Sequence, residues 1–365
     1  MKKKVALIFA AMMSVCLLSA CGNTDTASAS ASSQPQSTVA ELTEPQTQEE
    51  AETVPAGSIP ALDEIREIPA AYLQESSQPG TIERVEYQTA SYTVPDETQD
   101  KYAYIYVPYG YDETRQYDVL YLLHGGGGSV GTCFGGEGQS SELKRILDNL
   151  IANGEMEPLL VVTPTFYLMG NTDNSVSTAG ELVAHFPAEL ANDLIPAVES
   201  QYSTYAETTD PQGLTASRGH RAFGGFSMGA VTTWYVFMEN LDYFHTFIPI
   251  SGDCWAIATQ GGGSQPEETA GALEQALEDS GYGPENFFIY AITGSEDIAY
   301  PMMSSQIEAM QDLPDSFHFG TDYGVENIRF SVLDGGVHNY DYVRRYLYNL
   351  MPLLWPSASG LEVME

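Results

Sequence analysis

The sequence predicts an α/β fold in which a mostly parallel central sheet is covered by helices on both faces. From the middle of the chain onward, short apolar runs alternate with segments of helical periodicity. The apolar runs are solid rather than alternating, which is typical of strands buried on both faces by crossover helices. Ligands bind such sheets at the carboxyl ends of the strands, so we expect functional residues in the loops that follow the strands.

The predicted elements follow one another in a regular order. Residues 80–94 and 101–108 alternate apolar and polar side chains and predict two strands joined by the turn cluster PDETQD. Further strands are predicted for YDVLYLL, PLLVVTPTF, HRAFGGF, HTFIPIS, ENFFIYAIT and NIRFSVLD. Helices are predicted for residues 140–154, about 180–202, 228–241, 302–311 and 340–355.

The first 21 residues are typical of an export signal. Lys2, Lys3 and Lys4 form a basic start, and the apolar run to Leu18 is too short for a comfortable membrane span. The run ends in LLSAC, which resembles the lipobox of bacterial lipoproteins and implies cleavage before Cys21 and lipidation of its thiol. We therefore expect an extracytoplasmic protein anchored to the cell membrane by lipid; the alternative is a secreted protein in which Cys21 is incidental.

Two regions follow the signal. Residues 22–61 are dominated by Ser, Thr, Gln, Ala, Glu and Pro and contain no aromatic residue, Lys or Arg. Such a segment cannot bury enough apolar surface to offset chain ordering, which predicts a disordered linker. Residues 62–358 have a globular composition and are numerous enough for one large α/β domain.

Charge and cysteine content restrict the partners and cofactors. The formal net charge of −36 argues against a nucleic-acid partner, and we expect membrane contact only through the lipid anchor. Cys133 and Cys254 either form a disulfide or remain free thiols. No Cys or His spacing indicates zinc, and a plain loop is preferred to a calcium site around Asp173. The sequence thus predicts no metal and no cofactor.

The pattern GxSxG occurs twice, as GGSVG at 127–131 and GFSMG at 225–229. A nucleophile elbow needs a strand, a sharp turn that carries the serine, and a helix. Ser227 follows the strand RAFGGF and precedes an apolar helix, whereas Ser129 lies in a glycine-rich loop with no helix directly after it. Ser227 is therefore the predicted nucleophile.

A serine nucleophile needs a histidine to remove its proton and an acid to orient that histidine. His338 lies between the strand NIRFSVL and the last helix, at the sheet edge expected for Ser227. In α/β-hydrolases the acid lies between serine and histidine in the chain and follows a strand, which favours Asp297 in TGSED. Asp334 is the second choice and Asp253 the third.

Ester hydrolysis also needs donors for the oxyanion. The amide of Met228, directly after the nucleophile, is one predicted donor. The second is predicted in HGGGG after a buried strand, where glycines let a backbone N–H face the substrate. Gly126 is the preferred residue, with Gly127 next to it.

The segments YLLHGGGG, ELANDLIPAVESQY, GGFSMGAVTTWYVF, ISGDCW, TGSED and GGVHNYDYVRRYLYNLMPLLW together resemble the feruloyl and acetylxylan esterases of the esterase D-like carbohydrate esterases, over about residues 87–355. The resemblance implies an α/β-hydrolase fold and metal-free hydrolysis of feruloyl or acetyl esters of plant cell-wall xylan. It places the triad on Ser227, Asp297 and His338.

The sequence leaves several alternatives open. Trp255 follows a strand, so it either stacks on a sugar or feruloyl ring or belongs to the core or a lid. Acyl transfer as in the similar mycolyltransferases, a peptidase, and a catalytically silent surface protein that binds glycans are the alternative functions. The acyl group and the oligomeric state do not follow from the sequence.

Overall fold

The computed structural model describes residues 64–94, 96–170, 173, 175–320 and 326–355. The predicted signal (1–21), its lipidation residue Cys21 and the predicted linker (22–61) lie outside these residues. The strands are β1 (Thr81–Ala90), β2 (Thr98–Val107), β3 (Val119–Leu123), β4 (Leu160–Thr163), β5 (Arg221–Phe226), β6 (Thr246–Ile250), β7 (Phe288–Gly294) and β8 (Ile328–Leu333).

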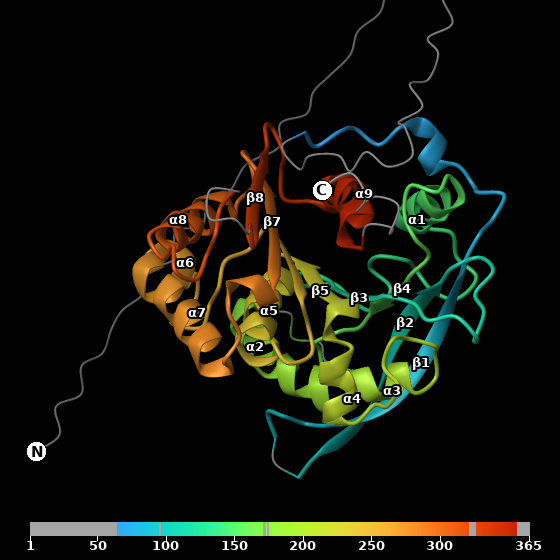
Figure 1. The fold of residues 1–365 in the computed structure, drawn as a ribbon, viewed down its shortest axis with the longest axis horizontal. Helices are drawn as coiled ribbons and strands as arrows, with labels where there is room; N and C mark the ends of the chain where they lie inside the picture. Colours follow the sequence, from blue (N-terminus) through green and yellow to red (C-terminus); the bar gives the residue numbers. More distant parts are fainter. Residues whose placement is uncertain (1–63, 95, 171–172, 174, 321–325, 356–365) are drawn as a thin grey trace, which may run out of the picture. The chain divides into compact units, whose positions relative to one another are not determined.

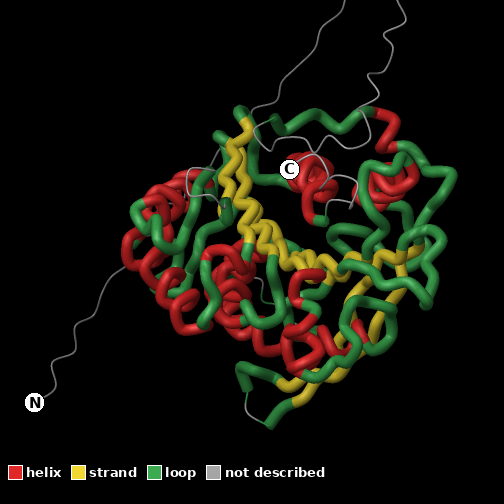
Figure 2. The backbone as a smooth tube through the Cα atoms, in the orientation of Figure 1, coloured by secondary structure: helices red, strands yellow, loops and turns green. Residues whose placement is uncertain are grey.

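The strands form one 8-stranded sheet in the order β1-β2-β4-β3-β5-β6-β7-β8. The sheet is twisted, as the strands drawn in yellow in Figure 2 show. Strand β2 pairs antiparallel with both β1 and β4, and every pair from β4 to β8 is parallel. The two period-two segments predicted from the sequence are the antiparallel pair β1 and β2. The solid apolar runs are the parallel strands, so the predicted α/β fold class is confirmed.

The described helices of the domain are α1 (Glu142–Ala152), α2 (Val176–Glu189), α3 (Ile195–Glu199), α4 (Pro211–Ala216), α5 (Met228–Glu239), α6 (Gly261–Ser264), α7 (Pro266–Ser280), α8 (Tyr300–Gln311) and α9 (Tyr340–Leu354). Helices α1 and α9 lie on one face of the sheet, and α2, α5 and α7 lie on the other (Figure 1). Successive β3 residues point to opposite faces: Tyr121 packs in the α2–α5 core and Leu122 in the α1–α9 core. Both faces are therefore buried.

The long helical region before β5 differs from the sequence prediction, and the short helices α4 and α6 were not predicted. The helix predicted from about residue 180 begins at Val176, because the Ser175 side chain caps it by accepting from the Thr178 N–H at 3.3 Å. It continues through the π-helix Leu190–Leu194 into α3.

The sequence prediction missed α7 entirely. Its signals are Pro266 in the first turn, with Glu267 and Glu268, and the left-handed Gly281 after its end, where φ is 75°.

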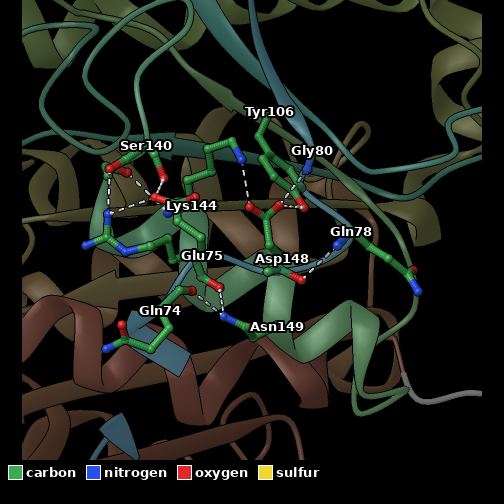
Figure 3. A network of polar contacts seen from close by, with 12 residues as sticks. Gln74, Glu75, Gln78, Gly80, Tyr106, Ser140, Lys144, Asp148 and Asn149 are labelled. Carbon is green, nitrogen blue, oxygen red and sulfur yellow. Dashed lines mark hydrogen bonds and ion pairs between the residues drawn. The ribbon is translucent and has the colours of Figure 1, made fainter. Parts of the chain in front are cut away.

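A buried carboxylate ties the start of the domain to helix α1 (Figure 3). Asp148 accepts from Lys144 Nζ at 2.6 Å, from the Tyr106 hydroxyl at 2.9 Å and from the Gly80 N–H at 2.8 Å. Three donors thus bind the two carboxylate oxygens, and a charge can be buried only when it has such partners. The contact holds α1 against β2 on the face that α9 also covers.

Over the described ranges, no helix is long and apolar enough to cross a membrane.

Candidate active site

Ser227 occupies a strained turn between β5 and α5. Its φ of 57° and ψ of −114° are unusual for a residue with a side chain, and the strain is typical of a functional turn. The Ser227 N–H donates to the Ile250 carbonyl at 2.9 Å, which ties the turn to the end of β6. The predicted arrangement of strand, sharp turn and helix is present.

The flanking glycines are required because the two sides of this turn touch. A Cβ added to Gly225 would lie 2.6 Å from the Gly229 carbonyl carbon, and one added to Gly229 would lie 2.5 Å from the Leu123 carbonyl oxygen. Both contacts are to backbone atoms, which cannot move aside cheaply. The glycines of GFSMG therefore let α5 start directly against β3 and β5.

The structure brings Ser227, His338 and Asp297 together in one hydrogen-bonded chain. His338 Nε2 lies 3.0 Å from Ser227 Oγ, and His338 Nδ1 lies 2.7 Å from Asp297 Oδ1. A carboxylate only accepts, so the Nδ1 proton is donated to Asp297, and the Nε2 lone pair of the neutral ring faces the serine. This is the geometry of a nucleophile, a general base and an orienting acid.

Burial differs along this chain of residues. The Asp297 side chain is 1% exposed and the His338 side chain 20% exposed, while Ser227 is half-buried. The Phe226 ring lies 4.4 Å from the His338 ring, measured between centroids, and supports it from the strand side. The acid is thus shielded from water while the hydroxyl remains accessible.

The other sequence candidates lie elsewhere. Asp334 is exposed and accepts from the Ser295 hydroxyl at 3.2 Å. Asp253 is buried and accepts from Trp255 Nε1 at 3.1 Å and from the Gly262 N–H at 2.9 Å, and burial raises the pKa of its carboxyl. Neither carboxylate hydrogen-bonds His338.

Ser129 lies exposed in the glycine-rich loop. Its N–H donates to the Thr132 hydroxyl at 2.8 Å, and no histidine hydrogen-bonds its own hydroxyl among the residues described.

Both predicted oxyanion donors lie next to the serine. Met228 begins α5, where the first N–H groups of a helix have no acceptor within the helix. A Cβ on Gly126 would lie 3.3 Å from Met228 Cγ, and one on Gly125 would lie 3.2 Å from Ser227 Cβ. The glycine loop after β3 is therefore in contact with the elbow.

Three side chains hold this loop, and the sequence prediction missed them. His124 Nδ1 donates to the Gly125 carbonyl at 2.7 Å, and the hydroxyls of Tyr340 and Tyr167 accept from the Gly125 and Gly127 N–H groups. His124 has a sequence signal, because it directly precedes the glycines. The tyrosines have none, since they approach from distant parts of the chain.

Trp255 borders a surface pocket of about 390 Å³. The pocket is lined by Val176, Ser177, Gly180, Glu181, Tyr235, Trp255 and Thr259. The Trp255 loop also touches the elbow, because a Cβ on Gly252 would lie 2.7 Å from the Ser227 carbonyl oxygen. Trp255 is half-buried, so its ring packs against the core and still faces this pocket.

Cys133 and Cys254 are free, which decides the alternative that the sequence left open. Burial raises the pKa of both thiols to about 12, so both are protonated at neutral pH. Over the described part of the chain, no group of three or more His, Cys, Asp or Glu side chains could hold a metal ion.

Known proteins are similar to this chain in sequence or in fold. The chain is 42% identical over 287 residues to endo-1,4-beta-xylanase Y of Acetivibrio thermocellus, a match that covers 79% of this chain and 24% of that protein. It therefore spans about a quarter of the length of this curated relative.

Two solved structures are also similar. A serine-to-alanine mutant of the feruloyl esterase module from Clostridium thermocellum, complexed with sinapinate, is 43% identical, with a TM-score of 0.67; the match covers 79% of this chain and 92% of that one. A CE1 ferulic acid esterase from Anaeromyces mucronatus is 15% identical, with a TM-score of 0.56 and coverage of 80% and 96%, and shows a shared fold.

A family model named Esterase, with the description "Putative esterase", matches residues 98–295. The match covers more than half of the chain and includes the elbow and the glycine loop. It agrees with the resemblance that the sequence motifs indicate. The chain belongs to the esterase family.

Proposed function

We propose that this protein is a serine carboxylic-ester hydrolase that removes acyl groups from plant cell-wall polysaccharide, namely feruloyl or acetyl esters of xylan. The observation that carries the proposal is the hydrogen-bonded chain from Ser227 Oγ through His338 to Asp297, with distances of 3.0 Å and 2.7 Å. The similar feruloyl esterase module, whose structure holds sinapinate, supports an aromatic acyl group.

The geometry suggests how the reaction proceeds. Ser227 Oγ attacks the ester carbonyl carbon while His338 Nε2 takes its proton, and Asp297 stabilises the imidazolium that forms. The N–H groups of Met228 and Gly126 bind the oxyanion of the tetrahedral intermediate. The imidazolium then protonates the leaving alcohol, and a water activated by His338 releases the acid from the acyl-enzyme.

The Trp255 pocket is the proposed site for the ring of the acyl group or a neighbouring sugar. An aromatic side chain beside a concave surface is suited to stacking on either. Trp255→Ala is expected to raise KM for feruloyl esters more than for p-nitrophenyl acetate, because the small acetyl group does not reach the indole. An equal effect on both substrates would argue for a core role instead.

The central test is Ser227→Ala assayed with methyl ferulate and p-nitrophenyl acetate. The variant should lose activity by several orders of magnitude while circular dichroism and thermal stability match the wild type. Ser129→Ala is the matched control and should retain wild-type rates. Retained activity in a clean Ser227→Ala preparation would refute the proposal.

We also propose that the mature protein is lipid-anchored at Cys21 outside the cytoplasm. The basic start, the apolar run to Leu18 and the LLSAC ending support this proposal. In cells fed a labelled fatty acid, the wild type should carry the label and sediment with membranes. Cys21→Ala should do neither, and label in this variant would contradict the assignment.

A further inference from the structure

The glycine loop after β3 has four N–H groups, and three of them are occupied. The Gly125 N–H donates to the Tyr340 hydroxyl at 2.9 Å and the Gly127 N–H to the Tyr167 hydroxyl at 3.0 Å. The Gly128 N–H donates to the Gly125 carbonyl at 3.1 Å. Within the described residues the Gly126 N–H has no acceptor, and Gly126 is exposed. The loop therefore leaves a single amide available to a ligand.

Peptide planarity explains how that amide is aimed. The Gly125 carbonyl and the Gly126 N–H belong to one trans peptide plane and point in opposite directions. His124 Nδ1, at 2.7 Å, and the Gly128 N–H both bind that carbonyl, so they also set the direction of the Gly126 N–H. The planes before and after it are set by Tyr340 and Tyr167 through the Gly125 and Gly127 N–H groups.

Tyr340 links this loop to the other parts of the site. It begins α9 two residues after His338, and its ring meets Phe226 edge-on at 5.0 Å between centroids. Phe226 precedes Ser227 and contacts the His338 ring. Burial raises the pKa of Tyr340, so its hydroxyl stays neutral and remains an acceptor for the Gly125 N–H.

Tyr167 is buried after β4, with its ring stacked on His124 at 5.8 Å and an interplanar angle of 17°. Tyr167 belongs to the core on the α2–α5 face of the sheet, whereas Tyr340 packs against the core on the α1–α9 face, so the two hydroxyls reach the loop from opposite faces. Successive glycines have no side chains to restrict them, so the loop depends on such external acceptors for a single conformation.

We propose that Tyr340 and Tyr167 are positioning residues whose phenol oxygens bind the amides on either side of Gly126 and so aim the Gly126 N–H at the oxyanion. The inference rests on the proposed esterase function and specifies which side chains outside the triad support it. Neither tyrosine needs to touch the substrate. Their effect is on the transition state, where charge develops on the carbonyl oxygen.

The test uses Tyr340→Phe and Tyr167→Phe in the full chain, with Tyr342→Phe as the matched control. Tyr342 lies on the same helix two residues later, and no described residue accepts from or donates to its hydroxyl. Each positioning variant should lower kcat about 10-fold, less than the 10²–10³ expected for outright loss of an oxyanion donor, with KM within about 2-fold.

A second readout separates positioning from general destabilisation. A trifluoromethyl ketone analogue of the acyl group forms a tetrahedral adduct with a serine and carries an oxyanion, so its Ki should rise in both variants by the factor lost in kcat. The affinity of ferulate, measured in a Ser227→Ala background, should stay the same. Tyr342→Phe should change neither constant.

Two results would overturn the inference. One is wild-type kcat and Ki in both Tyr→Phe variants. The other is a fall in kcat with unchanged Ki for the ketone, which would indicate a purely structural role. Failure of the proposed function is recognised separately, because the wild type and Ser227→Ala would then hydrolyse esters equally poorly before any tyrosine is changed.

Discussion

Asp297 binds His338 through one oxygen only. Its Oδ1 accepts from His338 Nδ1 at 2.7 Å and from the Ala299 N–H at 2.8 Å. Its Oδ2 is buried and has no hydrogen-bond partner among the described residues. One oxygen therefore orients the histidine, and that oxygen is itself fixed by the backbone.

Asp297→Asn should lower kcat about 10⁴-fold at neutral pH. An amide in this place can donate to Nδ1, which moves the ring proton to Nε2 and removes the lone pair that accepts the serine proton. Steady-state kinetics with methyl ferulate measures the effect. Asp334→Asn is the control and should stay within about 2-fold of wild type, since Asp334 is exposed and pairs with Ser295. A large loss of kcat in Asp334→Asn with near wild-type kcat in Asp297→Asn would identify Asp334 as the catalytic acid instead.

Gly225→Ala should abolish activity by opening the elbow. The new methyl group would lie 2.6 Å from the Gly229 carbonyl carbon, so β5 and α5 must separate and the serine must move away from His338. Gly271→Ala is the matched control, because a Cβ there meets nothing within 4 Å on the surface of α7. Its free energy of unfolding should rise by up to about 1 kcal/mol, with normal kcat. Normal kinetics in Gly225→Ala would show that the elbow tolerates a side chain.

His124 should make the folded state sensitive to acid. Burial lowers its pKa to about 4, while the unfolded chain protonates at the usual value of 6.5. As pH falls below 6.5, the unfolded state therefore binds a proton that the folded state excludes until about pH 4. The contribution of the neutral ring to the free energy of unfolding is fully present above pH 6.5. It falls by about 3 kcal/mol as the pH drops from 6.5 to about 4. Urea unfolding of His124→Asn should show a correspondingly shallower loss between pH 7 and 4, and parallel curves would contradict the assignment.

Replacing only one partner of the buried ion pair Lys101–Glu189 should destabilise the folded protein strongly. Lys101 Nζ lies 2.7 Å from Glu189 Oε1 and donates to the Thr165 carbonyl at 2.7 Å, with exposed fractions of 0% and 8% for the two side chains. Lys101→Met leaves a buried carboxylate without its counter-charge and should reduce the free energy of unfolding by about 3–5 kcal/mol. The double change Lys101→Met with Glu189→Gln should cost less.

The exposed pair Arg84–Glu86 serves as the comparison for that measurement, because its side chains are 40% and 73% exposed. Glu86→Gln should change the free energy of unfolding by less than about 1 kcal/mol. If Lys101→Met costs no more than Glu86→Gln, the buried pair is not a source of stability.

The sequence predicted most of the parallel sheet because its signals are local. A solid apolar run followed by glycine, as in YLLHGGGG, identifies a buried strand without knowledge of its neighbours. The same holds for Ser227, since strand, turn and helix are consecutive in the chain. Helix α7 was missed because its buried positions, such as Leu273 and Leu277, lie in a segment rich in Glu and Ala with little apolar contrast.

What the sequence by itself determined is the fold class, the position of the elbow at Ser227 and a histidine at the correct sheet edge, all of which depend on residues close in the chain. What only the tertiary structure decided is which carboxylate meets His338 Nδ1, that the two thiols stay apart, and that no described residue accepts from the Gly126 N–H. These depend on strand order and on side chains that arrive from distant segments, such as Tyr340 and Tyr167. Local periodicity carries no information about such contacts, because they form only when the strands assemble side by side.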